Sequence, residues 1–201
     1  MNVSEIEPLV HRNVSVAGVS EEFVTRWSPR AMSGEPLEPG ALDVLFEAAR
    51  WAPSCFNAQP WRFLYAHRDS DAWGLFFDTL VEGNQSWAAN AGALIAVLSR
   101  THYERNDEPA PTHEFDAGAA WMCIALQGAK MNLVTHAMRG FDAQLAQQSL
   151  RIPELFKINA MIAVGRPGEL DVLSGSQRER EVPSERKLVA EFAHEGEFPE
   201  R

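Results

Sequence analysis

The sequence has little of several features that would assign a protein to a class. It contains only two cysteines in 201 residues, Cys55 and Cys123, too few for a disulfide framework. No apolar run approaches the roughly 18 residues of a membrane span, and the first residues lack the basic start and apolar stretch of a secretory signal. These absences predict a reduced, cytoplasmic protein that does not enter a membrane.

Lysine is also scarce, since it supplies three of the 18 basic residues and arginine supplies the rest. The formal net charge is −10, and no basic block interrupts the sequence. A nucleic-acid partner is therefore not expected, because binding to a phosphate backbone needs clustered Lys and Arg. Arginine is the better planar partner for a single phosphate group.

Several chemical motifs are missing. There is no HExxH and no clustered His, Cys, Asp or Glu spacing, so no metal site is predicted. There is no GxGxxG after a strand and no Walker loop, so a Rossmann dinucleotide domain is not supported.

What the sequence does contain is a globular composition, 45% hydrophobic and 23% charged, which predicts one α/β-type domain over residues 1–201. Hydrophobic periodicity predicts strands at 61–66, 93–99, 133–137 and 158–164, and helices at 39–50, 71–80, 113–131 and 142–150. The helix at 113–131 is apolar nearly all round, so it belongs in the core or in a subunit interface. Periodicity alone would also allow a doubly wound sheet.

Residues 51–63 hold an unusual set of hydroxyl and carboxamide groups between a predicted helix and a predicted strand. Asn and Gln each offer donors and an acceptor, which suits reading the edge of a flat heterocycle. The alternative is an ordinary helix-to-strand turn, in which Pro, Ser and Asn are common. The candidate residues are Pro53, Ser54, Cys55, Asn57 and Gln59.

Basic residues near both ends of the chain could hold an anion. Arg26, Ser28 and Arg30 alternate, so in an extended segment they would point the same way, and Arg binds phosphate through charge-assisted bonds. Trp27 between them could stack or pack. Near the C-terminus Arg186 and Lys187 are second candidates. Either group could equally be a solvated surface.

Two of these motifs together resemble the nitroreductase family of FMN enzymes: R-x-S-x-R at 26–30, followed by A-P-S-x-x-N-x-Q-P-W-x-F at 52–63. Asn84 and the H-x-M-x-G-F segment at 136–141 extend the resemblance, which runs from about residue 24 to about residue 188. The C-terminal basic element departs from the family pattern because it lacks the expected proline.

The resemblance implies an α+β fold, with a central mixed, mostly antiparallel sheet wrapped by helices and one long buried helix. It implies a homodimer with FMN at the interface, where residues 26–30 of one subunit meet residues 53–57 of the other. The implied cofactor-binding residues are Arg26, Trp27, Ser28, Arg30, Pro53, Ser54, Cys55, Asn57, Gln59, Asn84, Asp116, Ala137, Met138, Arg139, Gly140, Arg186 and Lys187.

Some of these assignments stay open. A shift of one residue would give the role of Asn84 to Gln85. Asp116 could instead be a first-turn carboxylate favoured by the helix dipole. Gly140 suits a backbone that must approach a planar ring closely.

The implied activity is hydride transfer from NADH or NADPH, through FMN, to a nitroaromatic, quinone or enal-like acceptor in ping-pong order. No catalytic side chain is expected, because the cofactor carries the chemistry. Two alternatives remain: reductive dehalogenation or flavin fragmentation on the same fold, and a non-catalytic flavin carrier or sensor.

Overall fold

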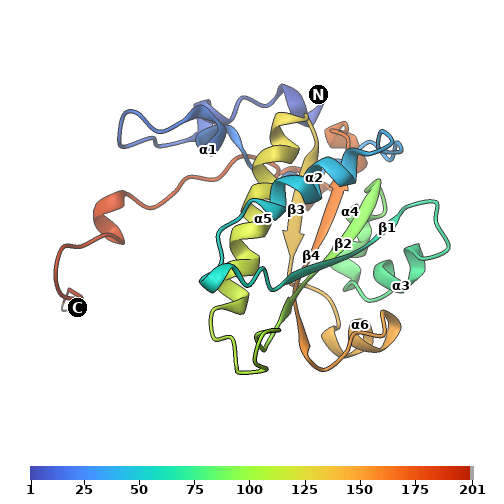
Figure 1. The fold of residues 1–201 in the computed structure, drawn as a ribbon. Coiled ribbons are helices and arrows are strands. Elements are labelled where there is room, and N and C mark those ends of the chain that lie inside the picture. The colour runs from blue at the N-terminus through green and yellow to red at the C-terminus, as the bar shows by residue number, and fades with distance from the viewer. Residues whose placement is uncertain (200–201) are drawn as a thin grey trace.

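A four-stranded sheet lies at the centre of the computed structural model, which describes residues 1–199. Its strands are β1 (Trp61–His67), β2 (Ala93–Arg100), β3 (Val134–Met138) and β4 (Phe156–Gly165), in the order β1-β2-β4-β3 (Figure 1). Each of the three pairings is antiparallel. All four strands fall within two residues of the predicted ranges, and the α+β fold is confirmed.

The two faces of the sheet carry separate cores, because successive strand residues point to opposite sides. Along β2, Ile95 and Val97 pack against α2 (Ala41–Arg50) and α5 (His113–Lys130). Their neighbours Leu94 and Leu98 belong to the other core. Strand β2 is buried at every position except Arg100, which explains its nearly continuous apolar sequence.

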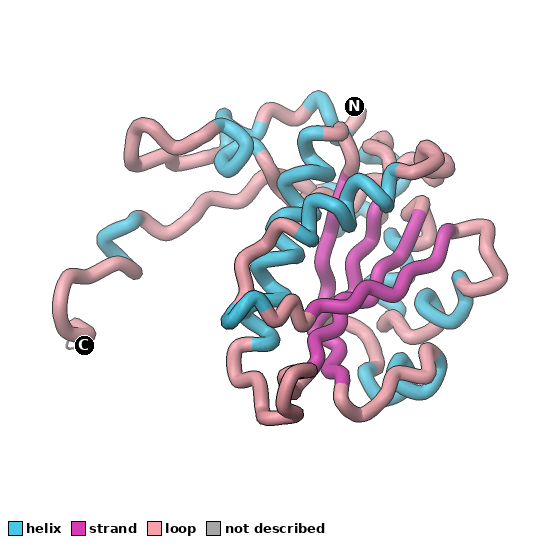
Figure 2. Tube along the Cα trace, in the orientation of Figure 1, coloured by secondary structure: helices cyan, strands magenta, loops and turns pink. Residues whose placement is uncertain are grey.

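Short helices cover the second face: α3 (Trp73–Phe77), α4 (Glu82–Ala88) and α6 (Ala143–Ser149). Figure 2 shows helices on both sides of the strands. The prediction of one helix over 71–80 was wrong in extent, since α3 has only five residues. The chain must leave the helix there because Leu80 bridges to Phe141 and the Val81 amide donates to Gly140 O, at 3.1 Å.

Helix α5 is buried on one side only. Ala117, Ala120 and Ile124 are fully buried against the sheet and α2, whereas Phe115 is 82% exposed and Met122 is 36% exposed. The all-round apolar sequence of this helix therefore reflects two different surfaces. The outer surface is apolar and lies uncovered in the single chain.

Two terminal segments extend from the same side of the body. The N-terminal arm, residues 9–25, contains α1 (Glu21–Thr25), and the C-terminal tail, residues 179–199, follows α7 (Gly175–Arg178) (Figure 1). Most of their residues are exposed. Among residues 1–199 no helix is long and apolar enough to cross a membrane.

Gly168 marks the closest backbone contact between the N-terminal region and the sheet. Its amide donates to Ala31 O at 3.0 Å and its carbonyl accepts from Val3 N at 2.9 Å. A Cβ placed there would lie 2.4 Å from the carbonyl carbon of Met32. The chain cannot move aside without losing these hydrogen bonds.

We therefore expect Gly168→Ala to lower stability by about 1–3 kcal/mol, the usual cost of overpacking. The melting temperature should fall by about 2–4 °C per kcal/mol for a chain of this size. Gly83→Ala is the matched control, because a Cβ at Gly83 would meet nothing within 4 Å. Equal melting temperatures for the two variants would contradict the close contact.

Candidate functional site

A cavity of about 240 Å³ brings together five arginines from separate parts of the chain. The lining includes the segment 26–30 and residues 180–186 of the tail, and Glu181 is the only carboxylate in it. The five guanidinium groups belong to Arg12, Arg26, Arg30, Arg180 and Arg186. This excess of positive charge suits an anionic ligand with several acceptor oxygens.

The segment 26–30 begins with extended backbone at Arg26. Helix α1 ends at Thr25, and Arg26 has φ −62° and ψ 127°. Arg26 Nη1 donates to Ser28 Oγ at 3.1 Å, which places both side chains on one side of the segment. Arg26, Ser28 and Arg30 all line the cavity, together with Trp27.

Glu181 fixes the position of this segment. Its side chain is fully buried, and Oε1 accepts from the Arg30 amide and, at 2.9 Å, from the Ala31 amide. Arg30 Nη1 lies 3.3 Å from Oε2. Part of the hydrogen-bonding capacity of Arg30 is thereby used inside the protein, which leaves Arg26 as the less committed guanidinium.

The pKa values of two arginines are lowered in the cavity. Burial is the main cause for Arg26, followed by the charge of Arg186. Burial also lowers the pKa of Arg12, with further contributions from Arg186 and Arg26. Like charges held close together in a partly buried place destabilise one another, so an anion bound among them would relieve a cost already present.

His136 of β3 supports the segment from behind. Its Nδ1 lies 3.0 Å from Pro29 O, so Nδ1 carries the proton and donates. The imidazole packs on Trp87 with ring centroids 4.7 Å apart. The His136 side chain therefore has a packing and hydrogen-bonding position.

Asn84 and Gly140, both predicted cofactor residues, contact each other. Asn84 Nδ2 donates to Gly140 O at 2.8 Å, and a Cβ on Gly140 would lie 2.6 Å from that nitrogen. The absence of a side chain at Gly140 therefore has a structural reason within the chain. Gln85, the alternative to Asn84, donates instead to Phe77 O at 3.1 Å.

The side chains of residues 137–139 contact other parts of the chain. Met138 is buried in the core beside α3, α4 and α6, while Ala137 packs on the opposite face. The guanidinium of Arg139 lies 4.9 Å from the ring centroid of Phe141.

The second predicted group, residues 53–59, is a strained turn. Phe56, Asn57 and Gln59 all have left-handed φ values of 47° to 53°, which are uncommon outside glycine. Ser54 Oγ accepts from the Gln59 amide at 3.0 Å, and Gln59 Nε2 donates to Asn57 O at 3.1 Å. Phe56 and Asn57 are exposed, as is Pro53.

Asp116 holds this turn against the start of α5. Its buried Oδ2 accepts from the Cys55 amide and from Thr112 Oγ1, both at 3.2 Å. The Asp116 carboxylate, in the first turn of α5, thus connects the turn 53–59 to the loop that ends at Thr112. Cys55 itself contacts Tyr103, whose hydroxyl lies 3.6 Å from Sγ.

The two groups contact different parts of α5. Residues 53–59 contact Asp116 at its start, while Arg26 lines one cavity with Met122 in its middle and another with Ala129 beside its end. The 18-residue helix is about 27 Å long at 1.5 Å per residue.

The two predicted basic residues of the tail share a space of about 300 Å³ beside Met122. Arg186 also lines the arginine cavity, whereas Lys187 is not part of that lining. Sequence reasoning missed Arg12 and Glu181. Arg12 lies in a weakly patterned region, and no local signal marks Glu181 as the buried member of a charged run.

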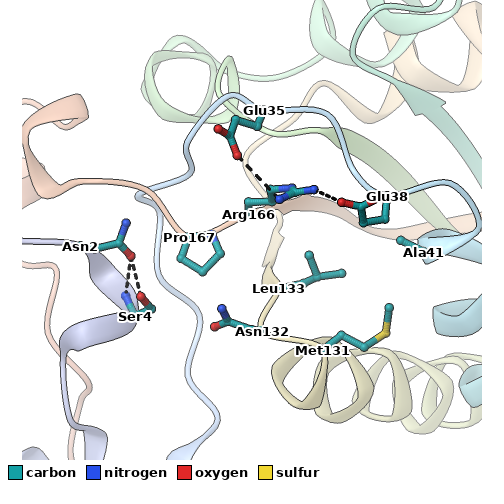
Figure 3. A pocket seen from close by; sticks show the side chains of 10 residues that line it. All are labelled: Asn2, Ser4, Glu35, Glu38, Ala41, Met131, Asn132, Leu133, Arg166 and Pro167. Carbon is teal, nitrogen blue, oxygen red and sulfur yellow. Dashed lines mark hydrogen bonds and ion pairs between the residues drawn. The ribbon is translucent and has the colours of Figure 1, made fainter.

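Another cavity, of about 380 Å³, lies between the N-terminus, the end of α5 and Arg166 (Figure 3). Arg166 is paired there with both Glu35 and Glu38. Its charge is already balanced, so this cavity lacks the surplus that distinguishes the arginine cavity. Across residues 1–199, no group of three His, Cys, Asp or Glu side chains could hold a metal ion.

The fold and site define an α+β protein that gathers arginines for an anionic ligand next to an uncovered apolar helix. The sequence profile described as "Nitroreductase family" matches residues 24–78 and 67–166, together more than half of the chain. The chain belongs to the nitroreductase family.

Solved structures agree with this assignment. The chain is similar to "the oxidoreductase containing FMN", with 43% identity, a TM-score of 0.89 and coverage of 93% of this chain and 96% of that one. It shares its fold with "a putative nitroreductase in complex with FMN" from Desulfovibrio desulfuricans, with 24% identity, a TM-score of 0.71 and coverage of 92% and 100%.

A curated relative from Streptomyces coelicolor is named "Putative NADH dehydrogenase/NAD(P)H nitroreductase SCO7141". The two sequences are 37% identical over 67 residues, which make up 33% of this chain. The match spans about a third, 32%, of that relative.

His136 generates a pH-dependent prediction. Burial lowers its pKa below the ordinary 6.5, an effect that the bond to Pro29 O opposes in part. Below pH 6.5 the unfolded chain therefore takes up a proton that the folded chain does not, and stability falls as the pH decreases. We expect the melting temperature of the parent to fall more between pH 8 and 5.5 than that of His136→Gln. Parallel pH profiles would contradict a buried, neutral imidazole.

Proposed function

We propose that this protein is an FMN-dependent oxidoreductase that uses NADH or NADPH to reduce a small oxidised acceptor such as a nitroaromatic, a quinone or an enal. The observation that carries the proposal is that Arg26, Ser28 and Arg30 of the family motif all line the arginine cavity, which supports a role in binding the phosphate group of FMN. Bound FMN would supply the hydride chemistry, accepting hydride from the nicotinamide and donating it to the acceptor in ping-pong order.

The donor set fits a phosphate monoester. Arg26 and Ser28 are already aligned by their own hydrogen bond, and Arg12 has a buried Nε with no hydrogen-bond partner. A phosphate group presents several oxygens to such donors, and charge-assisted bonds are about twice as strong as neutral ones. The relief of repulsion among Arg12, Arg26 and Arg186 adds to the binding free energy.

The rest of the cofactor would lie against neighbouring backbone and the Asn84 side chain. Asn84 is tied to the Gly140 carbonyl, so its position is set before any ligand binds. The segment 137–140 offers backbone groups, with Arg139 turned toward Phe141. These residues would orient a flat ring, and none is needed as an acid or base.

Two copies would complete the site. The exposed apolar side of α5, with Phe115 and Met122, offers a surface for a partner, and the turn 53–59 and Arg26 contact different parts of this helix within one chain. In a homodimer, the turn of one subunit would approach Arg26 and Asn84 of the other, through Pro53, Ser54, Cys55, Asn57 and Gln59.

Each of the two chains, residues 1–201, would act as one domain. Both Cys55 and Cys123 are free, in keeping with a proposed cytoplasmic setting.

The test is spectroscopic and kinetic. The purified protein should carry a flavin absorption band, and it should oxidise NADH or NADPH with menadione or a nitroarene as acceptor. A flavin-loaded protein that turns over none of these acceptors would indicate a carrier or sensor. A protein that binds no FMN even when the cofactor is added would contradict the proposal.

Replacing Arg26 tests the phosphate assignment. We expect Arg26→Ala to remain folded but to bind FMN about 10- to 100-fold more weakly, because hydrogen bonds to charged groups contribute about 1.5–3 kcal/mol each. The exposed Arg151 is the matched control, and Arg151→Ala should keep full occupancy. Released flavin per protomer is the measurement, and unchanged occupancy in Arg26→Ala would refute the assignment.

The dimer is tested at Phe115, which is 82% exposed on the uncovered face of α5. A buried, unpaired carboxylate there would be costly, so Phe115→Glu should shift the protein from dimer to monomer in sedimentation velocity. Leu75→Glu, on the opposite side of the sheet, introduces the same charge at an exposed apolar position and should leave the dimer intact. An FMN-loaded monomeric parent would overturn the shared site.

A further inference from the structure

The arginine cavity has a wall that the family motif does not include. Arg12 comes from the N-terminal arm, 14 residues before Arg26, and its Nη2 donates to Arg26 O at 3.4 Å. Its Nε is buried and has no hydrogen-bond partner. A buried donor without a partner is costly, and an oxygen of an anion in the cavity would satisfy it.

The arm is joined to the tail directly beside Arg12. Asn13 Nδ2 donates to Arg186 O at 2.7 Å, and the Arg186 amide donates back to Asn13 Oδ1 at 3.0 Å. The Asn13 side chain thus forms a two-bond bridge between segments 173 residues apart. Arg186 also bonds to Ser184 Oγ at 2.7 Å, which shapes the tail at the rim of the cavity.

Both segments also meet α5, because residues of the arm and Val189 of the tail line a space with Met122, but their side chains are only partly covered. Val14, Val16 and Val19 are each about half exposed, and so are Leu188 and Val189 in the tail. Terminal segments with few buried contacts open easily. At their junction three arginines lie close together, and the pKa values of Arg12 and Arg26 are lowered there, mainly by burial and further by the neighbouring arginine charges. The junction is therefore held together by Asn13 and opposed by charge.

We propose that the arm and the tail form a latch closed by a phosphate monoester, with Arg12 as an additional phosphate ligand that couples binding to closure. The proposal rests on the proposed function in one respect, that the phosphate is carried by FMN. Binding of the dianion turns the repulsion among Arg12, Arg26 and Arg186 into shared attraction, so the arm and tail close over the cavity. Cofactor retention then depends on segments far from the ring-binding residues.

Hydrogen–deuterium exchange measures this closure directly. The apo protein is compared with protein in excess FMN, in riboflavin, and in riboflavin with inorganic phosphate. Exchange in residues 9–20 and 182–192 should slow with FMN and with added phosphate, but not with riboflavin alone, which lacks the phosphate group. A further sample with inorganic phosphate and no flavin separates the effect of the anion from any effect of the ring.

Two variants distinguish the contribution of the Arg12 charge from that of the Asn13 bridge. Arg12→Gln should weaken FMN binding roughly tenfold and abolish protection of 9–20, while residues 26–30 are still protected at saturating FMN. Asn13→Ala keeps every arginine but removes the bridge, so it should also weaken FMN binding and should leave both the arm and the tail less protected. Circular dichroism melting confirms that each variant is folded.

The outcomes separate the two proposals. If FMN binds and protects 26–30 while 9–20 and 182–192 exchange as in the apo protein, the latch is overturned and the function stands. If phosphate protects both segments but FMN does not bind, the latch stands and the flavin function fails. Equal protection by riboflavin and FMN would also overturn the latch, since closure would then follow the ring.

Discussion

The carboxylate of Glu181 is the contact on which the arrangement of the arginine cavity depends. It accepts from two successive backbone amides, those of Arg30 and Ala31, and pairs with the Arg30 guanidinium from a fully buried position. Without it, residues 26–30 would have no fixed place relative to the tail, and five positive groups would share the cavity with no negative one. A buried carboxylate is stable only when it is fully hydrogen-bonded, so this residue and the segment it holds are ordered together.

Helix α5 sets the second constraint, which is distance. Its start is tied to the turn at Cys55 through Asp116, and its end lies beside Arg26. The same helix that separates the two groups in one chain offers the uncovered apolar surface on which a second chain could lie. Helix α5 thus both separates the two groups of residues within one chain and offers a surface for a second chain. A shared site follows if two copies pack with their α5 helices against each other.

The sequence was sufficient for the sheet, for α2 and α5, and for the side-by-side placement of Arg26 and Ser28, because alternation and three-to-four spacing are local signals. It was insufficient where contacts between residues far apart in the sequence determine the structure. The helix predicted over 71–80 is short because Leu80 bridges to Phe141. Gly140 looked like a close approach to a ligand, yet Asn84 already fills the space a side chain would need. Glu181 and Arg12 acquire their roles only from residues more than ten positions away.

The charge in the cavity also explains why the terminal segments belong to the site. Arg26, Ser28 and Arg30 alone could contact only one side of a phosphate group. Glu181 already pairs with the Arg30 guanidinium, which reduces the number of donors that Arg30 can offer. The remaining positive charge comes from Arg12, Arg180 and Arg186, which lie in the arm and the end of the chain. In the proposed latch, binding would be weak while the arm and the tail are open and strong when they are closed. The affinity would then depend on the equilibrium between the open and closed forms of these segments as much as on the motif at 26–30.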